Sequence, residues 1–347
     1  MNTIFTLRRV VFNAVIAGAL AAAAAVASAP MLQAQAPGRG QGAGAAAPAG
    51  RGGATTDVRV LKVRENIFML SGAGGNITVM TFPEGALVVD TGTTQMANAV
   101  LETVKRLSPK PITHIIDTNA SDDHVGGNAV LAASGRRIPQ EVVAGEGPMI
   151  IAHEKVMTRL SAPTGKEAAA PERAWPNETY HLEDKKLSRR FHGDEPIQLF
   201  HAPAAHSDGD TLVWFRRADV IATGDIFMTT TYPIIDVAHG GTIDGVIAGL
   251  NKVLDLAFPE FRSEGGTMII PGHGRLSDMA DVAYYRDMLT IIRDRVQDAI
   301  KKGQTVEQVK AAKLTRDYDG RFGAATGPWT TDMFVDAVYK TLSTKKS

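Results

Sequence analysis

Acidic and imidazole side chains stand together in one short stretch of the sequence, DDHVGGN at 122–128, where Asp123 and His124 precede a Gly-Gly turn. Further residues of these two types each follow an apolar run and precede a glycine-containing turn, namely His206, Asp225 and His273. Zinc accepts imidazole nitrogens and carboxylate oxygens as ligands, and it lowers the pKa of a bound water to about 7. The pattern therefore predicts a metal site that makes hydroxide available at neutral pH.

The composition of the chain limits the classes of molecule that such a site is expected to bind. The chain has 347 residues, of which 44% are hydrophobic, and this is enough to bury a sizeable core. The 37 basic and 37 acidic side chains cancel, so the sequence offers no electrostatic footprint for nucleic acid. The absence of cysteine excludes disulfides, thiolate metal ligands and a cysteine nucleophile. A small-molecule substrate is the expected partner, and the oligomeric state stays open.

The first 56 residues are typical of a targeting segment followed by a linker. Arg8 and Arg9 precede an alanine-rich apolar run, and small-residue triplets follow it, so 1–36 is expected to be a signal peptide. An uncleaved membrane anchor is the alternative, because the apolar run is nearly long enough to span a bilayer. Residues 37–56 are rich in Gly, Ala and Pro and indicate a flexible linker. We expect a periplasmic or secreted protein with no stable membrane span after removal of the signal.

The elements that must position the polar residues fall into two β-rich halves. The first half predicts an antiparallel meander, a helix and a further strand that leads into the 122–128 motif, with bounds 58–63, 66–72, 76–82, 86–92, 95–107 and 112–117. The second half predicts strands at 197–202, 211–215, 219–224 and 267–272 and helices at 245–257 and 281–302. Two such halves predict two sheets packed face to face with helices outside, and the loops at one end would bring distant motifs together.

In their order along the chain, the motifs resemble those of the metallo-β-lactamase superfamily. They are VVDTG with Asp90, DDHVGGN, AHSDGDTLVWF, VIATGDIF and IIPGHG, and the resemblance covers about 58–278. It implies an α/β fold, the four-layer αβ/βα sandwich of two mixed sheets with helices outside, in a domain at 57–302 followed by a C-terminal helical extension at 303–347. It also implies that Asp123, His124 and His273 hold one metal, with Asp225 matching the residue that bridges two metals.

The sequence departs from the family pattern H-x-H-x-D-H-x-G-G at its first two positions, where it has Asn119 and Ser121. In the family those two histidines join the counterpart of His206 to hold a first metal. The resemblance therefore implies one zinc per chain, with two as the alternative. Asp123, Asp122 and Ser121 are the catalytic candidates, and His206 could serve as the base instead.

The remaining polar residues have structural interpretations. Asp90 is expected to hydrogen-bond the metal loop instead of ligating a metal. His114 and His201 are expected to be structural, and four further histidines in polar or irregular contexts are expected to be solvated, namely His153, His181, His192 and His239. The segment 154–182 is interpreted as a linker with an anchoring Trp175, or alternatively as a substrate lid.

Two functions from different classes remain. The first is an exported hydrolase with a single zinc that opens an ester, an amide or a lactone. The alternative is a non-catalytic pseudoenzyme that keeps the sandwich as a binding module, with its metal absent or structural. The sequence does not name a substrate, because selectivity in a shared fold lies in its loops.

Overall fold

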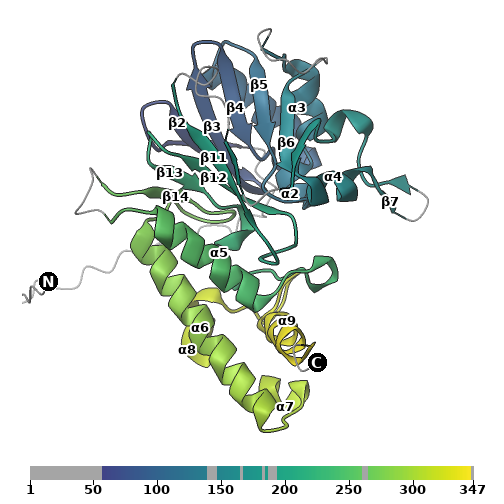
Figure 1. Cartoon of the computed structure of the whole chain (residues 1–347), viewed down its shortest axis with the longest axis vertical. Helices are drawn as coiled ribbons and strands as arrows, with labels where there is room; N and C mark the ends of the chain where they lie inside the picture. The colour runs from purple at the N-terminus through teal and green to yellow at the C-terminus, as the bar shows by residue number, and fades with distance from the viewer. Residues whose placement is uncertain are drawn as a thin grey trace, which may run out of the picture. The chain divides into compact units, whose positions relative to one another are not determined.

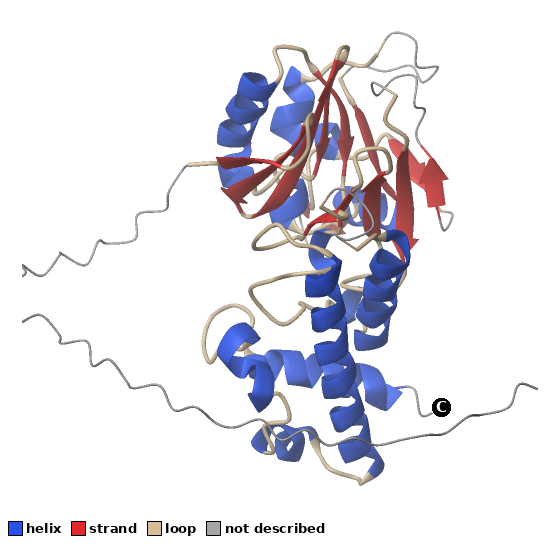
Figure 2. Ribbon diagram, turned by 90° about the vertical axis from the view of Figure 1, so that its left-hand side faces the viewer, coloured by secondary structure: helices blue, strands red, loops and turns tan. Residues whose placement is uncertain are grey.

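The computed structural model describes residues 57–138, 147–164, 167–181, 184–186, 194–259 and 265–344. The predicted signal peptide and linker, together with His192, lie outside these residues. Two large mixed sheets stack with helices on their outer faces, so the predicted αβ/βα sandwich is confirmed (Figures 1 and 2).

The first sheet has seven strands in the order β1-β2-β3-β4-β5-β6-β9. Its first four strands form the predicted antiparallel meander, and β5, β6 and β9 then add in parallel. The bounds are Arg59–Lys62, Ile67–Ala73, Gly75–Phe82, Gly85–Val89, Ile112–Ile116, Met149–His153 and Glu178–Tyr180.

The second sheet has five strands in the order β10-β11-β12-β13-β14. Neighbours are antiparallel except β13 and β14, which are parallel. The bounds are Asp184–Lys186, Ile197–Ala202, Asp210–Phe215, Val220–Ala222 and Met268–Ile270.

Alternation along the strands builds the layers, because successive side chains point to opposite faces of a sheet. On β4, Leu87 and Val89 face the core between the sheets, where they meet side chains of the second sheet such as Leu199. Their neighbours Ala86 and Val88 face outward, toward a cluster that includes side chains of α1 (Ala97–Leu107) and α3 (Asn128–Ser134). In the second sheet Phe200, Leu212 and Ile221 likewise face α5 (Ile243–Leu256) and α6 (Met279–Lys301).

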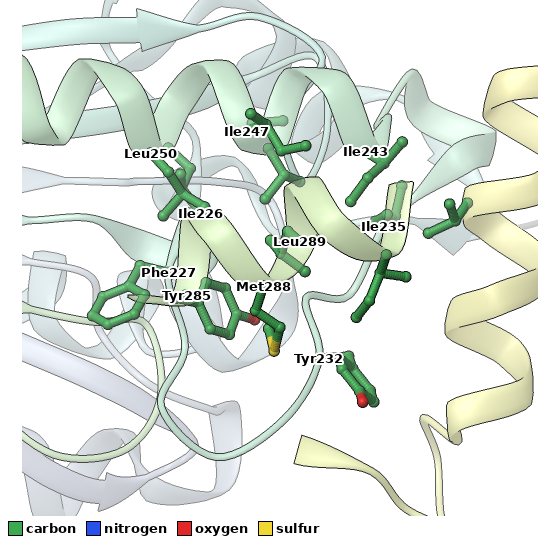
Figure 3. Close-up of a cluster of buried hydrophobic side chains, with 14 of the residues drawn as sticks. Ile226, Phe227, Tyr232, Ile235, Ile243, Ile247, Leu250, Tyr285, Met288 and Leu289 are labelled. Atoms are coloured by element: carbon green, nitrogen blue, oxygen red, sulfur yellow. The ribbon is translucent and has the colours of Figure 1, made fainter. Parts of the chain in front are cut away.

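The C-terminal helices pack on α5 and α6 and share their core. They are α7 (Val306–Ala311), α8 (Arg316–Phe322) and α9 (Thr331–Ser343). Figure 3 shows Tyr232 and Ile235, from the loop after β13, among the side chains of this core. The ring of Tyr232 stacks on Phe334 of α9 at 4.5 Å, and the Tyr232 hydroxyl donates to Asp319 of α8 at 2.8 Å. These helices therefore hold the loop that leads from Asp225 to α5.

The segment 154–182 is more than the predicted linker. It contains α4 (Glu154–Ser161), a short β7–β8 hairpin (Pro163–Thr164 and Glu167–Ala168), the 3-10 helix Glu172–Ala174 and then β9, which forms one edge of the first sheet. Trp175 does anchor it, since the indole Nε1 donates to the carbonyl of Ala170 at 2.9 Å. The linker interpretation was wrong because β9 pairs in parallel with β6, a contact that local composition does not reveal.

Two further expectations concern individual positions. His153 was expected to be solvated and is buried, because its ring stacks on His201 at 3.8 Å between the two sheets. His114 is buried as expected, and its ring Nδ1 is 2.9 Å from the Thr113 hydroxyl. Among the described helices, none is both long enough and apolar enough to cross a membrane.

Candidate metal centre

The ends of parallel strands deliver the candidate residues to one edge of the sandwich. In the first sheet β4 ends just before Asp90, and β5 ends before the loop that carries Asp123 and His124. In the second sheet β11 leads to His206, β13 to Asp225 and β14 to His273. These three strands run in the same direction, because β11 and β13 are both antiparallel to β12 and β14 is parallel to β13.

Asp90 organises the loop after β5 without joining the ligand cluster. Its carboxylate accepts hydrogen bonds from the Thr118 backbone N–H at 2.8 Å and from the Thr118 hydroxyl at 2.7 Å. It also lies 2.7 Å from His124 Nδ1. The expectation that Asp90 binds the metal loop is confirmed. With Nδ1 directed at Asp90, the second ring nitrogen of His124 is turned toward the other candidate ligands.

Three of the candidate ligands converge on one point. The ligand atoms of Asp123, His124 and His273 all lie within 4.8 Å of one another. Asp225 lies beside them, with its Oδ1 3.1 Å from His124 Nε2 and 3.3 Å from His273 Nε2. His124 and Asp225 are buried and His273 is part-buried, so the cluster sits at the inner end of the loops.

One nitrogen of the cluster indicates that a cation fits there. His273 Nε2 is buried and lies 3.0 Å from Asp123 Oδ2 and 3.3 Å from Asp225 Oδ1. Two carboxylate oxygens therefore meet this imidazole nitrogen at ion-pair distance. Two imidazoles and carboxylate oxygens form the donor set of a divalent cation of the zinc type.

The charges of the cluster are strongly coupled. Burial lowers the pKa of His124, but the carboxylates of Asp225 and Asp90 outweigh it and the pKa stands well above its ordinary value. Burial also lowers the pKa of His273, and the neighbouring Asp123 and Asp225 raise it to about 9. Burial raises the pKa of Asp225, whereas His124 and the other imidazoles bring it well below its usual range. The carboxylates thus favour positive charge at this point, which a bound cation would also supply.

Asn119, Ser121 and His206 form a hydrogen-bonded group beside Asp225, the closed half of the site. Asn119 Nδ2 donates to Asp225 Oδ2 at 3.3 Å, while Asn119 Oδ1 accepts from the Ser121 backbone N–H at 2.8 Å. The Ser121 hydroxyl is 3.3 Å from His206 Nε2, which is itself 3.9 Å from Asp225 Oδ2. Asp225 therefore separates two halves, with Oδ1 facing the ligand cluster and Oδ2 facing this hydrogen-bonded group.

Two glycines show how tightly the surrounding loops approach the cluster. A Cβ at Gly272 would lie 2.5 Å from Asp225 Oδ1, and one at Gly75 would lie 3.1 Å from His124 Nε2. The hairpin that carries Gly75 is tied to the His273 loop, since Asn76 Nδ2 donates to the carbonyls of Pro271 and Gly274. Glycine is required at position 272, because a Cβ there would also lie 2.6 Å from the backbone of Gly224, whereas at Gly75 the contacts are tight but longer.

The three catalytic candidates predicted from the sequence lie in different surroundings in the structure. Asp123 belongs to the cluster, and Ser121 faces His206. Asp122 is exposed, accepts a hydrogen bond from the Thr94 hydroxyl at 3.0 Å and does not belong to the cluster. Ligation of a metal by any of the predicted residues remains a prediction.

A comparison with protein families settles the relationship that the motifs suggest. The model of the metallo-beta-lactamase superfamily matches residues 70–310, which is more than half of the chain. The chain belongs to the metallo-beta-lactamase superfamily. The match to this superfamily includes Asp90 and every candidate ligand from Asp123 to His273. Among curated proteins none matches the chain.

Solved structures share the fold of this metallo-beta-lactamase superfamily member at low identity. The DIM-1 metallo-beta-lactamase is 17% identical with a TM-score of 0.51, and the alignment covers 67% of this chain and 97% of that one. A metallo-beta-lactamase from Pontibacter korlensis is 14% identical with a TM-score of 0.51, covering 67% and 99%. The sec-alkylsulfatase Pisa1 from Pseudomonas sp. is 14% identical with a TM-score of 0.56, covering 82% and 50%. These similarities extend to the fold alone.

Sequence reasoning missed the residues that support the site. Asp210 is buried and accepts from the Ser207 backbone N–H at 2.6 Å, which stiffens the loop after His206. Asn128 links Thr91 to Asp117 through its side-chain amide and so joins the loops after β4 and β5. Asp210 stands four positions after His206 in AHSDGD, which is the one signal that could have found it.

Proposed function

We propose that the protein is a hydrolase that uses one zinc ion held by Asp123, His124 and His273, with Asp225 beside them. The observation that carries this proposal is the convergence of the ligand atoms of Asp123, His124 and His273, which all lie within 4.8 Å of one another. The hydrogen bonds of Asn119 and Ser121 support a single ion, because they occupy the atoms that a second metal would need.

Zinc bound here would supply a Lewis acid and a water of lowered pKa. The residues of the chain would orient the metal ligands. Asp90 fixes the His124 ring by accepting from Nδ1, and it would raise the basicity of the other ring nitrogen. Asn119 holds the second oxygen of Asp225 and thereby orients its first oxygen toward the cluster. The substrate class that this arrangement suits is an ester, an amide or a lactone.

A metal-loading experiment combined with a panel of substrates tests the proposal. The purified protein would be stripped with a chelator, titrated with zinc, and assayed on p-nitrophenyl acetate, a lactone, a β-lactam and a secondary alkyl sulfate. We expect zinc-dependent turnover of at least one carboxylic substrate. His114→Gln is the matched control, because His114 is buried yet lies outside the cluster.

The alternative is a pseudoenzyme that keeps the sandwich as a binding module. The closure of the family's first metal position by Asn119 and Ser121 favours it, because that change removes ligands from the site. Zinc binding without turnover of any member of the panel would favour this alternative. Failure to bind zinc would exclude the proposed hydrolase.

We also propose export beyond the inner membrane, because Arg8, Arg9 and the apolar run that follows are typical of a signal peptide. Expression of the full chain with a C-terminal tag, followed by cell fractionation and sequencing of the mature N-terminus, tests it. Retention of residues 1–36 on a cytoplasmic protein would contradict it.

A further inference from the structure

Ser121 does not make the hydrogen bond that its position in the chain favours. It is the N-cap residue of α2 (Asp122–Val125), but its side chain accepts no hydrogen bond from the helix backbone. Serine at an N-cap ordinarily uses its hydroxyl in this way. Here the hydroxyl lies 3.3 Å from His206 Nε2 instead. The side chain is therefore committed to the imidazole and not to the helix.

The orientation of His206 makes its Nε2 an acceptor. His206 Nδ1 lies 2.8 Å from the carbonyl oxygen of Ile234, and because a carbonyl can only accept, Nδ1 carries the proton. Burial lowers the pKa of His206, but Asp225 and Asp210 outweigh it and raise the pKa above its ordinary value. Nε2 therefore presents a lone pair to the Ser121 hydroxyl only in chains whose ring is neutral. The backbone N–H of Asp236 also donates to the His206 carbonyl, which fixes the residue from the same loop.

Burial differs between the two partners in the way that a nucleophile and its base require. His206 is 5% exposed, so solvent does not compete for its ring nitrogens. Ser121 is only part-buried, so it is more exposed than the imidazole that it faces. The backbone of Ser121 is held by the side chain of Asn119, which accepts from its N–H at 2.8 Å. A positioned hydroxyl beside a shielded, oriented imidazole is the arrangement of serine nucleophiles.

We infer that Ser121 and His206 form a nucleophile–base pair that opens a carboxylic ester through an acyl-serine. The inference goes beyond the proposed function, because it assigns ester hydrolysis at the same site to an attacking group that does not depend on the metal. Ser121 takes the place of a metal-held water as the nucleophile and His206 accepts its proton, in the half of the site where Asn119 and Ser121 stand at the first two positions of the family pattern.

The proton and the bonds balance over two steps. Ser121 Oγ forms a bond to the carbonyl carbon while its proton passes to His206 Nε2, and the alcohol leaves with that proton when the C–O bond of the ester breaks. A water then attacks the acyl-serine and gives one proton to Nε2. The Ser121 oxygen recovers this proton as the acid departs. Ester and water are converted to acid and alcohol with no other reactant.

Covalent trapping in chelator-treated protein tests the pair without requiring turnover by a zinc-loaded enzyme. A fluorophosphonate transfers its phosphonyl group to an activated serine with loss of fluoride, and the adduct is stable. We expect one adduct per chain, mapped by peptide mass spectrometry to Ser121. His206→Asn should slow labelling at least ten-fold, because its amide can still donate to Ile234 but offers no base at the Nε2 position.

The controls separate activation from simple exposure. Ser134 is an exposed serine, and it should not be labelled under the same conditions. His181→Gln replaces an exposed histidine and should label as fast as the natural chain. Circular dichroism and thermal melting establish that each variant is folded. No adduct at Ser121 in the folded natural chain, or labelling that His206→Asn leaves unchanged, overturns the inference.

The failure of this inference can be told from failure of the proposed function. If Ser121→Ala retains zinc-dependent turnover and the natural chain gives no adduct, the nucleophile is another group and the metal hydrolase stands. If Ser121 is labelled in a His206-dependent way but the protein binds no zinc, the pair stands and the proposed metal chemistry falls.

Discussion

Restoring histidine at positions 119 and 121 should convert the closed half of the site into a second metal site. In the natural chain Asn119 donates to Asp225, and a hydrogen bond to a charged group contributes about 1.5–3 kcal/mol. The hydrogen bond between Ser121 and His206 contributes about 1 kcal/mol. The metal-free variant Asn119→His, Ser121→His should therefore be less stable by roughly 2–4 kcal/mol.

Zinc binding should restore the stability that the metal-free variant loses. Three imidazoles and Asp225 Oδ2 would then surround one point, and a ligand at about 1,000 times its Kd stabilises the folded state by about 4 kcal/mol. The assay is thermal unfolding with chelator and with graded free zinc, combined with the measured metal content. Each single variant should gain less than the pair, because a site short of one ligand binds more weakly.

The matched control is Asn119→Ala, Ser121→Ala, which loses the same hydrogen bonds but gains no ligands. It should be destabilised to a similar extent, and zinc should restore little of the loss. Our reasoning about the closed half is refuted if the histidine variant binds no additional metal. It is refuted equally if the natural chain already takes up two ions tightly.

Further expectations concern the support of the site, its pH dependence and its substrates. Asp90→Asn should weaken zinc binding by about 10–100-fold, because it removes the carboxylate that faces His124 Nδ1. Competition with a chelator measures this affinity, and an unchanged affinity would show that the contact does not contribute to zinc binding. Burial raises the pKa of Asp210 to about 7 from 3.8, so the folded state holds the extra proton and the free energy of unfolding should fall as the pH rises from about 4 through 7. This fall in the free energy of unfolding corresponds to roughly 4 kcal/mol. Urea titrations at several pH values should show that Asp210→Asn removes most of this pH dependence. If the free energy of unfolding falls equally with pH in both proteins, another group causes the pH dependence. Hydrolysis of a chromogenic β-lactam should be weak or absent, because one ion activates a nucleophile but does not also aim it between two metals, and efficient turnover by the natural chain would contradict this expectation.

The sequence was sufficient to predict the fold and most of the ligand cluster, because both depend on local patterns. A continuous apolar run such as that of β4 indicates a strand buried on both faces, and Asp123 and His124 follow the end of β5 within one short loop and helix. Residues at the ends of parallel strands meet at one edge whatever their separation along the chain. The order of the motifs therefore sufficed to bring His273 next to Asp123.

The remaining features depend on contacts that no local pattern encodes. His153 stands before a charged helix and looks solvated in sequence, but its ring is buried against His201 from the other sheet. The hydrogen bond from Asn119 to Asp225 joins residues 106 positions apart, and it depends on how two loops approach each other. The pairing of Ser121 with His206 likewise required knowledge of where the Ile234 carbonyl lies.

The metal content of the natural chain and of three ligand variants tests the central claim most directly. Protein purified without added metal would be loaded with zinc, desalted and analysed for metal per chain by elemental analysis. We expect about one zinc in the natural chain, as three ligands and Asp225 predict. His124→Ala and His273→Ala should retain essentially none, whereas His206→Ala should lose only part, because His206 faces the other oxygen of Asp225. Two tightly held ions in the natural chain, or equal losses in all three variants, would contradict the account.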